Sequence, residues 1–572
     1  MRLLKYLFLK SFDTKTQILL RVALIGVIVG CIAVVFRILT EKLSHIFFYN
    51  LYHREYWYEW LYPIGICTAG GLFAGIITQR YAKDAGGSGI PQVKHALNNP
   101  NITIKLRTVV VKFIGSVIGI SSGLSLGREG PTIHIGAGLG AKIAKLLNSK
   151  HQKRALASGA GAGLAAAFNT PIAGVLFIIE ELDKDFSSSS LGPAIVGTVS
   201  AAITCRLLYG DFFAFHFQSS NGMNLPAIPF HIFLGIVCGI IGIAFQKSIL
   251  KSLNFYQEKL SFVPAWMHGG LAGFITGIVA LWLPEAIGAG HSTLEGTLAQ
   301  AYIWWMIPLI FFFKYLLTLV AYGSGIPGGI FAPALILGAL LGTMFGNSIN
   351  ALFPFMDLNP STFAFVGMGA FFTAISRAPI TSIVMLFELT GNYDLVLPLM
   401  FACIIANITS EKLHLGGMDE NLLSRQGIKL THNTGSSYLE QFSVKEAMSR
   451  DPDCIEENIS LSSLNRVFQR TTHGALPVLD AEQCLVGIVT KNDLKRALTE
   501  NLKCKITVSE IMSRNPVKLT EENNLNQAIM SLHENNIGRL LIVDKANPQK
   551  LIGILTRSDI INFEATREID EV

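Results

Sequence analysis

Charged residues are scarce in this chain. Only 15% of its 572 residues are Asp, Glu, Lys or Arg, whereas 50% are hydrophobic, and the mean hydropathy is +0.44. Soluble domains carry roughly 25% charged residues, so this balance excludes an ordinary soluble protein and favours a membrane protein. The net charge of +6 is small for this length and gives no indication of nucleic-acid binding.

Patterns typical of metal sites and enzyme active sites are also lacking. The eight cysteines include no Cys-x-x-Cys pair, and the 13 histidines are scattered without ligand spacing. We therefore expect reduced thiols and no metal site. No Ser/His/Asp set and no phosphate-binding loop stands out, so we do not expect an enzyme.

The few charges are unevenly distributed, which predicts two regions. They are sparse from about residue 22 to 405 and dense from about 437 onward. The first clear membrane span opens at Val22–Val35. Further apolar segments lie near 61–79, 108–126, 191–207, 228–250, 265–289 and 300–322, and segments interrupted by Gly or Pro lie near 131–146, 155–182, 331–350, 361–390 and 394–410. Broken helices are tolerated in a bilayer only where protein or water surrounds the free backbone, which favours a transporter or channel.

The first region repeats internally. Two short motifs that contain glycine or proline recur in the same order. Each copy is followed by glycines or by a glutamate at the same spacing in the sequence. The matched pairs are 127–131 with 329–333, 168–172 with 376–380, and Glu180 with Glu388. Such repeats are typical of transporters with a site at the repeat interface. We place the halves at about 20–210 and 228–425.

The second region has its own repeat. The phrase at 444–452 recurs at 508–516, and each copy ends in a similar phrase, at 487–493 and 553–559. Helical and β-branched segments alternate between these ends, which predicts an α/β unit. A polar stretch at 426–438 reads as the linker.

Three phrases in the membrane region have the chemistry of an anion path. An anion inside a bilayer needs donors that do not carry a full opposite charge, and the free N–H groups of helix N-termini supply them. Glycine lets the backbone approach an ion, and proline suits a first helical turn. Each phrase precedes an apolar run, although any one alone would equally suit a loop or kink. They are Gly87-Ser-Gly-Ile-Pro91, Gly127-Arg-Glu-Gly-Pro131 and Gly323-Ser-Gly-Ile-Pro-Gly-Gly-Ile-Phe-Ala-Pro333.

These phrases resemble the signature motifs GSGIP, G(K/R)EGP and GxFxP of the CLC family of chloride channels and proton-coupled transporters. The resemblance covers about 20–425, within a membrane domain at 1–425. It implies an α-helical inverted-repeat fold with broken helices, and a homodimer with a separate ion path in each subunit. It also implies that the Ser88 hydroxyl and the Ile330 and Phe331 amides hold chloride. The full set of anion-binding residues that we predict is Ser88, Gly89, Ile90, Arg128, Gly130, Ile330 and Phe331.

Two glutamates are predicted to carry protons. A carboxylate such as Glu129, at an anion-binding helix terminus, can take the place of chloride and leave when protonated, which links the two ligands. The alternative is a glutamate that merely pairs with Arg128. The resemblance makes Glu129 the gating glutamate and Glu181 the internal proton-transfer residue; for Glu181 the alternative is a solvated helix end. Glu180, which matches Glu388, is expected to be structural and to cap backbone amides.

One departure from the family pattern concerns a tyrosine that usually helps to hold the central chloride. Here the matching stretch begins Met418-Asp419, so the tyrosine position falls on one of these two residues. An aspartate beside chloride would repel it, and we therefore expect Asp419 to point away or the register to shift. Lys314 and Arg377 are expected to be paired or at interfaces, outside the ion path.

The tail resembles a pair of CBS domains, at 439–498 and 503–566. In that family a Thr-x-x-Asp phrase ends each copy and its aspartate holds a nucleotide ribose. The resemblance thus assigns Thr490, Asp493, Thr556 and Asp559 to an adenine nucleotide that regulates the protein, although the same phrase also caps the following helix. Transport itself is expected to need no cofactor.

The leading hypothesis is chloride/proton exchange, with chloride, protons and membrane lipid as partners. The main alternative is a passive voltage- or proton-gated chloride channel, and a third is a CBS-gated cation channel, which would want a ring of carboxylates or carbonyls. We expect a bacterial inner membrane, because the compact length and the Arg of the Gly127–Pro131 phrase look more bacterial than eukaryotic. Both termini are expected to be cytosolic: the first 21 residues are basic, and they lack the small-residue cleavage site of a removable signal peptide.

Overall fold

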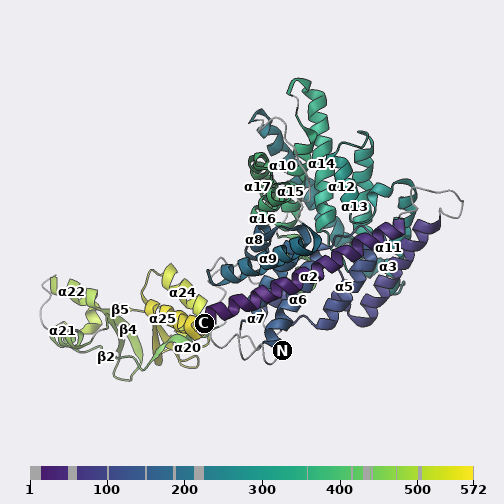
Figure 1. Cartoon of the computed structure of the whole chain (residues 1–572). Coiled ribbons are helices and arrows are strands. Elements are labelled where there is room, and N and C mark those ends of the chain that lie inside the picture. The colour runs from purple at the N-terminus through teal and green to yellow at the C-terminus, as the bar shows by residue number, and fades with distance from the viewer. Residues whose placement is uncertain are drawn as a thin grey trace. The chain divides into compact units, whose positions relative to one another are not determined.

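The computed structural model describes residues 14–48, 61–99, 102–147, 151–184, 188–210, 225–356, 358–413, 416–428, 439, 442–471, 473–499 and 506–570. The chain forms two compact units, Met1–Leu430 and Thr431–Val572 (Figure 1), which we call the membrane unit and the tail unit. The predicted linker falls largely on 429–438, outside the described residues.

Helices joined by loops make up the described part of the membrane unit, which contains no named strand, and these helices follow the apolar runs of the sequence. The first half (14–210) contains α2 (Thr14–Phe48), α3 (Leu61–Tyr81), α4 (Ile90–Asn98), α5 (Leu106–Ser121), α6 (Glu129–Leu146), α7 (Gln152–Phe168), α8 (Pro171–Phe177) and α9 (Ser188–Tyr209). The second half (225–428) contains α10 (Ile228–Asn254), α11 (His268–Trp282), α12 (His291–Leu298), α13 (Met306–Gly323), α14 (Phe331–Leu352), α15 (Pro360–Ser376), α16 (Pro379–Thr390), α17 (Val396–Leu413) and α18 (Met418–Arg425). Eight helical segments of the described part are long and apolar enough to cross a membrane.

The expected breaks occur at single left-handed residues. The α7–α8 break falls at Asn169 (φ 61°) and the α15–α16 break at Arg377 (φ 64°). Pro171 and Pro379 then occupy the first position of the next helix, where a missing N–H costs nothing. The two halves therefore break their helices at matching points.

Close packing of paired helices explains the glycines that follow each repeated phrase. Helices α6 and α7 pack together, as do α14 and α15. A Cβ added at Gly136 would collide with the carbonyl oxygen of Gly159, and one at Gly338 with that of Gly367. Only glycine lets the backbones approach this closely, as at other small-residue interfaces between membrane helices.

The tail unit contains two four-stranded sheets with helices. Its elements are α20 (Val444–Ala447), β1 (Ser449–Arg450), β2 (Ile455–Glu456), α21 (Leu461–Arg470), β3 (Ala475–Leu479), β4 (Leu485–Thr490), α22 (Lys491–Thr499), α23 (Val508–Ile511), β5 (Ser513–Arg514), β6 (Lys518–Thr520), α24 (Leu525–Glu534), β7 (Arg539–Val543), β8 (Leu551–Thr556) and α25 (Arg557–Asp570). The strand orders are β2-β3-β4-β5 and β1-β8-β7-β6.

Each copy of the tail repeat lends its opening strand to the other copy. Strand β1 pairs antiparallel with β8, and β5 pairs antiparallel with β4. The first copy's Val444 and Met448 accordingly lie in the core that contains Leu525 and Leu540 of the second copy. A boundary drawn in sequence order therefore separates each opening segment from the sheet that it completes.

Candidate anion site

The three glycine-rich phrases converge through backbone hydrogen bonds. The Gly87 N–H donates to the Ile326 carbonyl (3.1 Å), and the Gly328 N–H donates to the Gly87 carbonyl (3.0 Å). Gly127 and Gly329 exchange two hydrogen bonds, of 2.6 and 2.7 Å. These bonds bring together the N-terminal ends of α4, α6 and α14, which lie far apart in the sequence.

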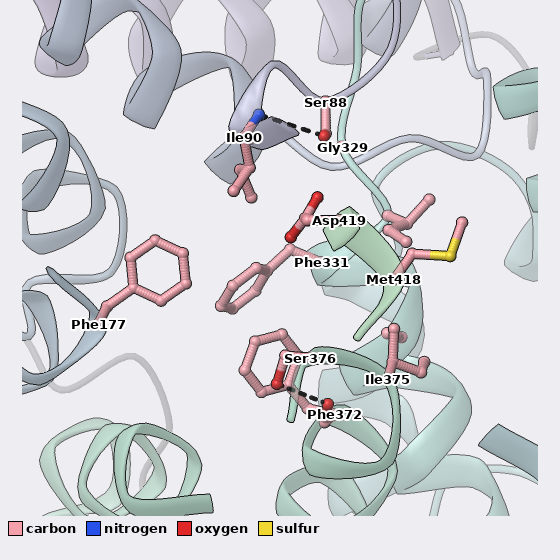
Figure 2. A pocket seen from close by; sticks show the side chains of 13 residues that line it. Ser88, Ile90, Phe177, Gly329, Phe331, Phe372, Ile375, Ser376, Met418 and Asp419 are labelled. Atoms are coloured by element: carbon pink, nitrogen blue, oxygen red, sulfur yellow. Dashed lines mark hydrogen bonds between the residues drawn. The ribbon is translucent and has the colours of Figure 1, made fainter. Parts of the chain in front are cut away.

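A small cavity lies where these helices begin. Its volume is about 30 Å³, whereas a single water molecule needs roughly 10–15 Å³. Its lining, drawn in Figure 2, consists of Ser88, Ile90, Gly130, Phe177, Gly329, Ile330, Phe331, Ala334, Phe372, Ile375, Ser376, Met418 and Asp419. Five of the seven predicted anion-binding residues thus share one cavity: Ser88, Ile90, Gly130, Ile330 and Phe331.

The chemistry of the cavity suits a small anion. Most of the lining is apolar, so an ion there has little water, and the first turns of three helices supply free N–H groups and positive dipole ends. The Ser88 hydroxyl adds a side-chain donor and also accepts a long hydrogen bond (3.4 Å) from the Ile90 N–H. A tyrosine hydroxyl lies beside Ser88, but it belongs to Tyr322 of α13.

The other two predicted anion-binding residues do not line this cavity. Gly89 precedes α4 in a left-handed conformation (φ 92°), where a Cβ would collide with His134, so its role is to let the loop turn. Arg128 is buried, and its guanidinium pairs with Glu41 of α2 (3.0 Å). The structure therefore assigns Arg128 an ion pair with Glu41 instead of a place in the cavity wall.

Glu129 is completely buried at the start of α6, next to the cavity-lining Gly130. Its carboxylate faces the backbone N–H groups of Arg128 and Ala332. Among the described residues no donor reaches either carboxylate oxygen in a hydrogen bond of ordinary geometry. Because Arg128 pairs with Glu41, the alternative in which Glu129 merely pairs with Arg128 is wrong.

Asp419 corrects one of our expectations. It was expected to point away from the anion or to be displaced by a register shift, but it lines the cavity together with Met418. Figure 2 shows its carboxylate projecting into the space between Ser88 and Phe331. The first turn of α18 places it there, so an acidic side chain faces the same small space as Ser88.

Glu181 is buried, 3% exposed, in a π-helical turn at Ile178–Leu182 that follows α8. Its carboxylate accepts a hydrogen bond of 2.5 Å from the ammonium group of Lys94, which is 1% exposed. A solvated helix end, the alternative considered above, is therefore wrong. Lys94 belongs to α4, the helix whose first residue, Ile90, lines the cavity.

The neighbouring Glu180 points elsewhere and makes a structural contact, as predicted. It accepts hydrogen bonds from the Ile380 and Thr381 N–H groups (3.0 and 2.7 Å) at the start of α16. Glu388 does the same for Ile172 and Ala173 (3.0 and 2.7 Å) at the start of α8. Each half thus caps a helix of the other half.

Among the residues that it describes, the structure buries three lysines, of which the sequence analysis singled out only Lys314. Lys112 donates to the carbonyl groups of Gly86 and Gly87 (3.3 and 2.8 Å) directly before Ser88. Lys314 donates to the carbonyl groups of Ile287 and Gly288 (3.3 and 2.6 Å), so it is paired, as expected. Lys94, described above, is the third. The signal that could have found all three is a single lysine inside an otherwise apolar or small-residue helix.

Comparison with known proteins identifies the family of the chain. A family model described as voltage-gated chloride channel matches residues 70–411, and the CBS domain model matches 444–500 and 508–565. The chain belongs to the voltage-gated chloride channel family. This CLC family comprises transporters and channels, not enzymes, and the chain is a multi-pass membrane protein with a CBS pair.

Among its relatives is a protein of Citrobacter koseri named H(+)/Cl(-) exchange transporter ClcA, 33% identical over 412 residues that cover 70% of this chain and 87% of that protein. A protein of the same name from Vibrio parahaemolyticus is 32% identical over 422 residues, 71% of this chain and 89% of the relative.

Solved structures of CLC proteins share the fold. A slow cyanobacterial Cl⁻/H⁺ antiporter superposes with a TM-score of 0.67 at 28% identity, over 72% of this chain and 97% of that one. A eukaryotic CLC transporter gives 0.65 at 19% identity, over 95% of this chain and 97% of that one, and at this identity the likeness shows the fold alone.

In the CBS pair of this CLC chain, the two Thr-x-x-Asp phrases form helix caps. The Asp493 carboxylate accepts hydrogen bonds from the Thr490 N–H (2.9 Å) and hydroxyl (2.7 Å), and its other oxygen accepts one from Arg496 (3.2 Å). Asp559 accepts the same two bonds from Thr556 (2.8 Å each) through one oxygen. Both phrases therefore perform the capping role that the sequence left open.

Proposed function

We propose that this protein exchanges chloride for protons across a membrane. The observation that carries the proposal is that two buried carboxylates, Glu129 and Glu181, are each connected to a different helix whose first turn lines one small cavity. Glu129 precedes the cavity-lining Gly130, and Glu181 pairs with Lys94 on the helix that begins at the lining residue Ile90. The exchange activity in the names of the relatives from Citrobacter koseri and Vibrio parahaemolyticus supports it.

Glu129 is the gate in this proposal. When ionised, its carboxylate lies against the helix N-termini that also attract chloride, so the two anions compete for the same donors. Protonation removes that competition and releases the side chain. Chloride and proton binding are then linked through one residue, and this linkage is reciprocal.

Glu181 is the second proton carrier. It is buried where an uncompensated charge would be costly, and Lys94 stabilises its ionised form. Lys94 compensates the charge of the ionised form and the protonated form has no charge to compensate, so Glu181 can hold or release a proton, as a proton carrier requires. In the proposal, Glu181 exchanges protons with the cytosol.

Chloride-driven proton movement in sealed vesicles that contain the purified protein tests the exchange. Wild type would be compared with Glu129→Gln and Glu181→Gln, and with Glu295→Gln, whose exposed carboxylate on α12 makes it a matched control. We expect an outward or inward chloride gradient to drive protons uphill in wild type and in the control. Both test substitutions should abolish proton movement while chloride still flows.

Chloride flow without any proton movement in wild type would overturn the exchange and favour a passive channel. The absence of the family's tyrosine from the Met418-Asp419 stretch that lines the cavity is the observation that favours this second function, because a weakened inner gate would uncouple the two ions. No chloride flow in any variant would overturn both.

We further propose that the CBS pair binds an adenine nucleotide. Asp559 supports this, because only one of its carboxylate oxygens has a partner among the described residues, which leaves the other to accept a ribose hydroxyl. Titration calorimetry of the full-length protein with ATP, ADP and AMP should give heat that Asp559→Asn removes. An absence of heat with all three nucleotides would contradict the proposal.

The assembly and location that we propose follow the family resemblance. The protein would form a homodimer with one anion path in each subunit, in a bacterial inner membrane with cytosolic termini. Light scattering of the detergent-solubilised protein tests the dimer, and a mass of one chain would contradict it. Protease access to the N-terminus in vesicles of known orientation tests the topology.

A further inference from the structure

An acidic group faces the anion cavity from the side of α18. Asp419 and Ser88 both line the cavity, and Figure 2 shows the Asp419 carboxylate projecting into it. An ionised carboxylate there would repel chloride strongly, because a space of about 30 Å³ leaves no room for many screening water molecules. A protonated carboxyl group would instead offer an O–H donor.

The groups around Asp419 do not fix its charge. From α4, the ammonium of Lys94 interacts electrostatically with it, but this ammonium is already hydrogen-bonded to Glu181. From its own helix, Glu420 adds a like charge, although Glu420 itself pairs with Lys184 (2.9 Å) and interacts with Arg377. From α13, Tyr322 contributes a neutral hydroxyl.

One cation thus serves two carboxylates in this cluster. Lys94, Glu181 and Asp419 carry a net charge of −1 when all three are ionised, and binding one proton makes the cluster neutral. Lys94 donates its direct hydrogen bond to Glu181, not to Asp419. Asp419 is therefore the member of the cluster whose proton binding changes the charge that faces the cavity.

We propose that Asp419 is a second proton-binding gate of the anion cavity, which repels chloride when ionised and donates a hydrogen bond to it when protonated. This inference rests on the proposed chloride transport and deepens it. It gives the cavity a titrating carboxylate in addition to Glu129, and it links chloride binding to proton uptake even where Glu129 is absent.

Chloride binding by detergent-solubilised protein tests this inference, with Glu129→Gln as the background so that the first carboxylate cannot titrate. Chloride would be titrated by calorimetry from about pH 5 to about pH 8, a range in which a partly buried carboxyl group can change its protonation state. We expect the dissociation constant to rise by about tenfold over this range, within the usual 5- to 150-fold coupling between linked sites. Adding Asp419→Asn should make the chloride dissociation constant independent of pH and keep it at its low-pH value.

Two matched variants and one further measurement separate this explanation from others. Glu420→Gln, at the next position of α18, should keep the pH dependence of the background. So should Lys94→Met combined with Glu181→Gln, which removes Glu181 without freeing the Lys94 ammonium for Asp419. The same titration in two buffers of different ionisation enthalpy should show proton uptake on chloride binding near neutral pH. This last measurement needs no change at Asp419, so it remains informative if Asp419→Asn does not fold.

Each failure has a distinct meaning. A pH-independent dissociation constant in the Glu129→Gln background, without proton uptake, would overturn the inference and leave the proposed exchange intact. A pH dependence that disappears when Lys94→Met and Glu181→Gln are combined would instead transfer the role to Glu181 and also overturn the inference. An absence of chloride binding in every variant would overturn the proposed function, and the inference with it.

Discussion

The two halves of the membrane unit have closely matching backbones in the loops before α4 and α12 and around the buried lysines. Before α4, two left-handed glycines follow a 3₁₀ turn: Gly87 (φ 65°) and Gly89 (φ 92°). Before α12, Gly288 (φ 65°) and Gly290 (φ 81°) follow another 3₁₀ turn. The buried lysines hold equivalent carbonyl groups, and the capping glutamates are exchanged between the halves.

The side chains at matching positions differ wherever we propose chemistry. A hydroxyl in the first half corresponds to an apolar side chain in the second. The two carboxylates correspond to an aromatic ring and an apolar side chain, and the ammonium group corresponds to an exposed carboxylate. The pairs are Ser88 and Ala289, Glu129 and Phe331, Glu181 and Leu389, and Lys94 and Glu295. Backbone geometry is thus common to both halves, whereas the ionisable site is built from the first half together with Asp419.

The largest expected difference between the halves concerns Lys94. Lys94→Met leaves Glu181 buried without a counter-charge, which should cost about 3–5 kcal/mol of stability. The matching Glu295→Gln alters an exposed side chain and should change stability by less than about 0.5 kcal/mol. Thermal unfolding of the purified protein in detergent would measure both.

A double substitution sharpens this prediction. Lys94→Met with Glu181→Leu replaces the whole pair by apolar groups, as Leu389 does in the second half, and should recover most of the lost stability. If the double variant is no more stable than Lys94→Met alone, the loss does not come from an unpaired charge.

Replacing Lys112 or Lys314 should lower stability by similar amounts but should affect chloride binding differently. Lys112→Met and Lys314→Met each remove two hydrogen bonds from an ammonium to backbone carbonyls, so each should cost about 2–3 kcal/mol. Only Lys112 holds the loop that presents Ser88, and only Lys112→Met should weaken chloride binding. Calorimetric titration with chloride of both folded variants would show this, and equal weakening would refute the asymmetry.

Removing the capping glutamates Glu180 and Glu388 should lower stability by similar amounts in the two halves. Glu180→Ala and Glu388→Ala each free two backbone N–H groups at a helix start, and each should lower stability by about 1–2 kcal/mol. Glu180→Ala should cost somewhat more, because Glu180 also accepts a hydrogen bond from the Thr381 hydroxyl (2.7 Å). Proton coupling should persist in both, and its loss in Glu180→Ala would mean that Glu180 carries protons.

Local chemistry made much of this arrangement predictable from the sequence. The helix breaks at Asn169 and Arg377 could be located because each precedes a proline that starts the next helix. The capping by Glu180 and Glu388 could be predicted because a repeat with a shared glutamate indicates a structural role. In the first case the decisive signal is a proline two residues after the break, and in the second it is the repeat itself, which links segments about 200 positions apart.

Contacts between distant segments could not be predicted in this way. Lys94 and Glu181 are separated by 87 positions, and neither has a neighbour in sequence that reveals the other. The Arg128 side chain was assigned by its place in a motif, but its partner, Glu41, lies in a helix that the motif does not include. Physical reasoning about repulsion misplaced Asp419, because the proton that can neutralise it was left out of the argument.

One of the smallest expected effects comes from making the halves alike at the cavity itself. Ser88→Ala reproduces Ala289 and removes one hydroxyl donor while the helix N-termini remain. A single hydrogen bond to an ion contributes about 1.5 kcal/mol at the low end of its range, which corresponds to roughly tenfold weaker chloride binding. Ala289→Ser, the reverse change in the second half, should leave the dissociation constant unchanged. If Ser88→Ala abolishes binding, the hydroxyl and not the helix amides holds the anion, and the shared backbone of the two halves would matter less than we infer.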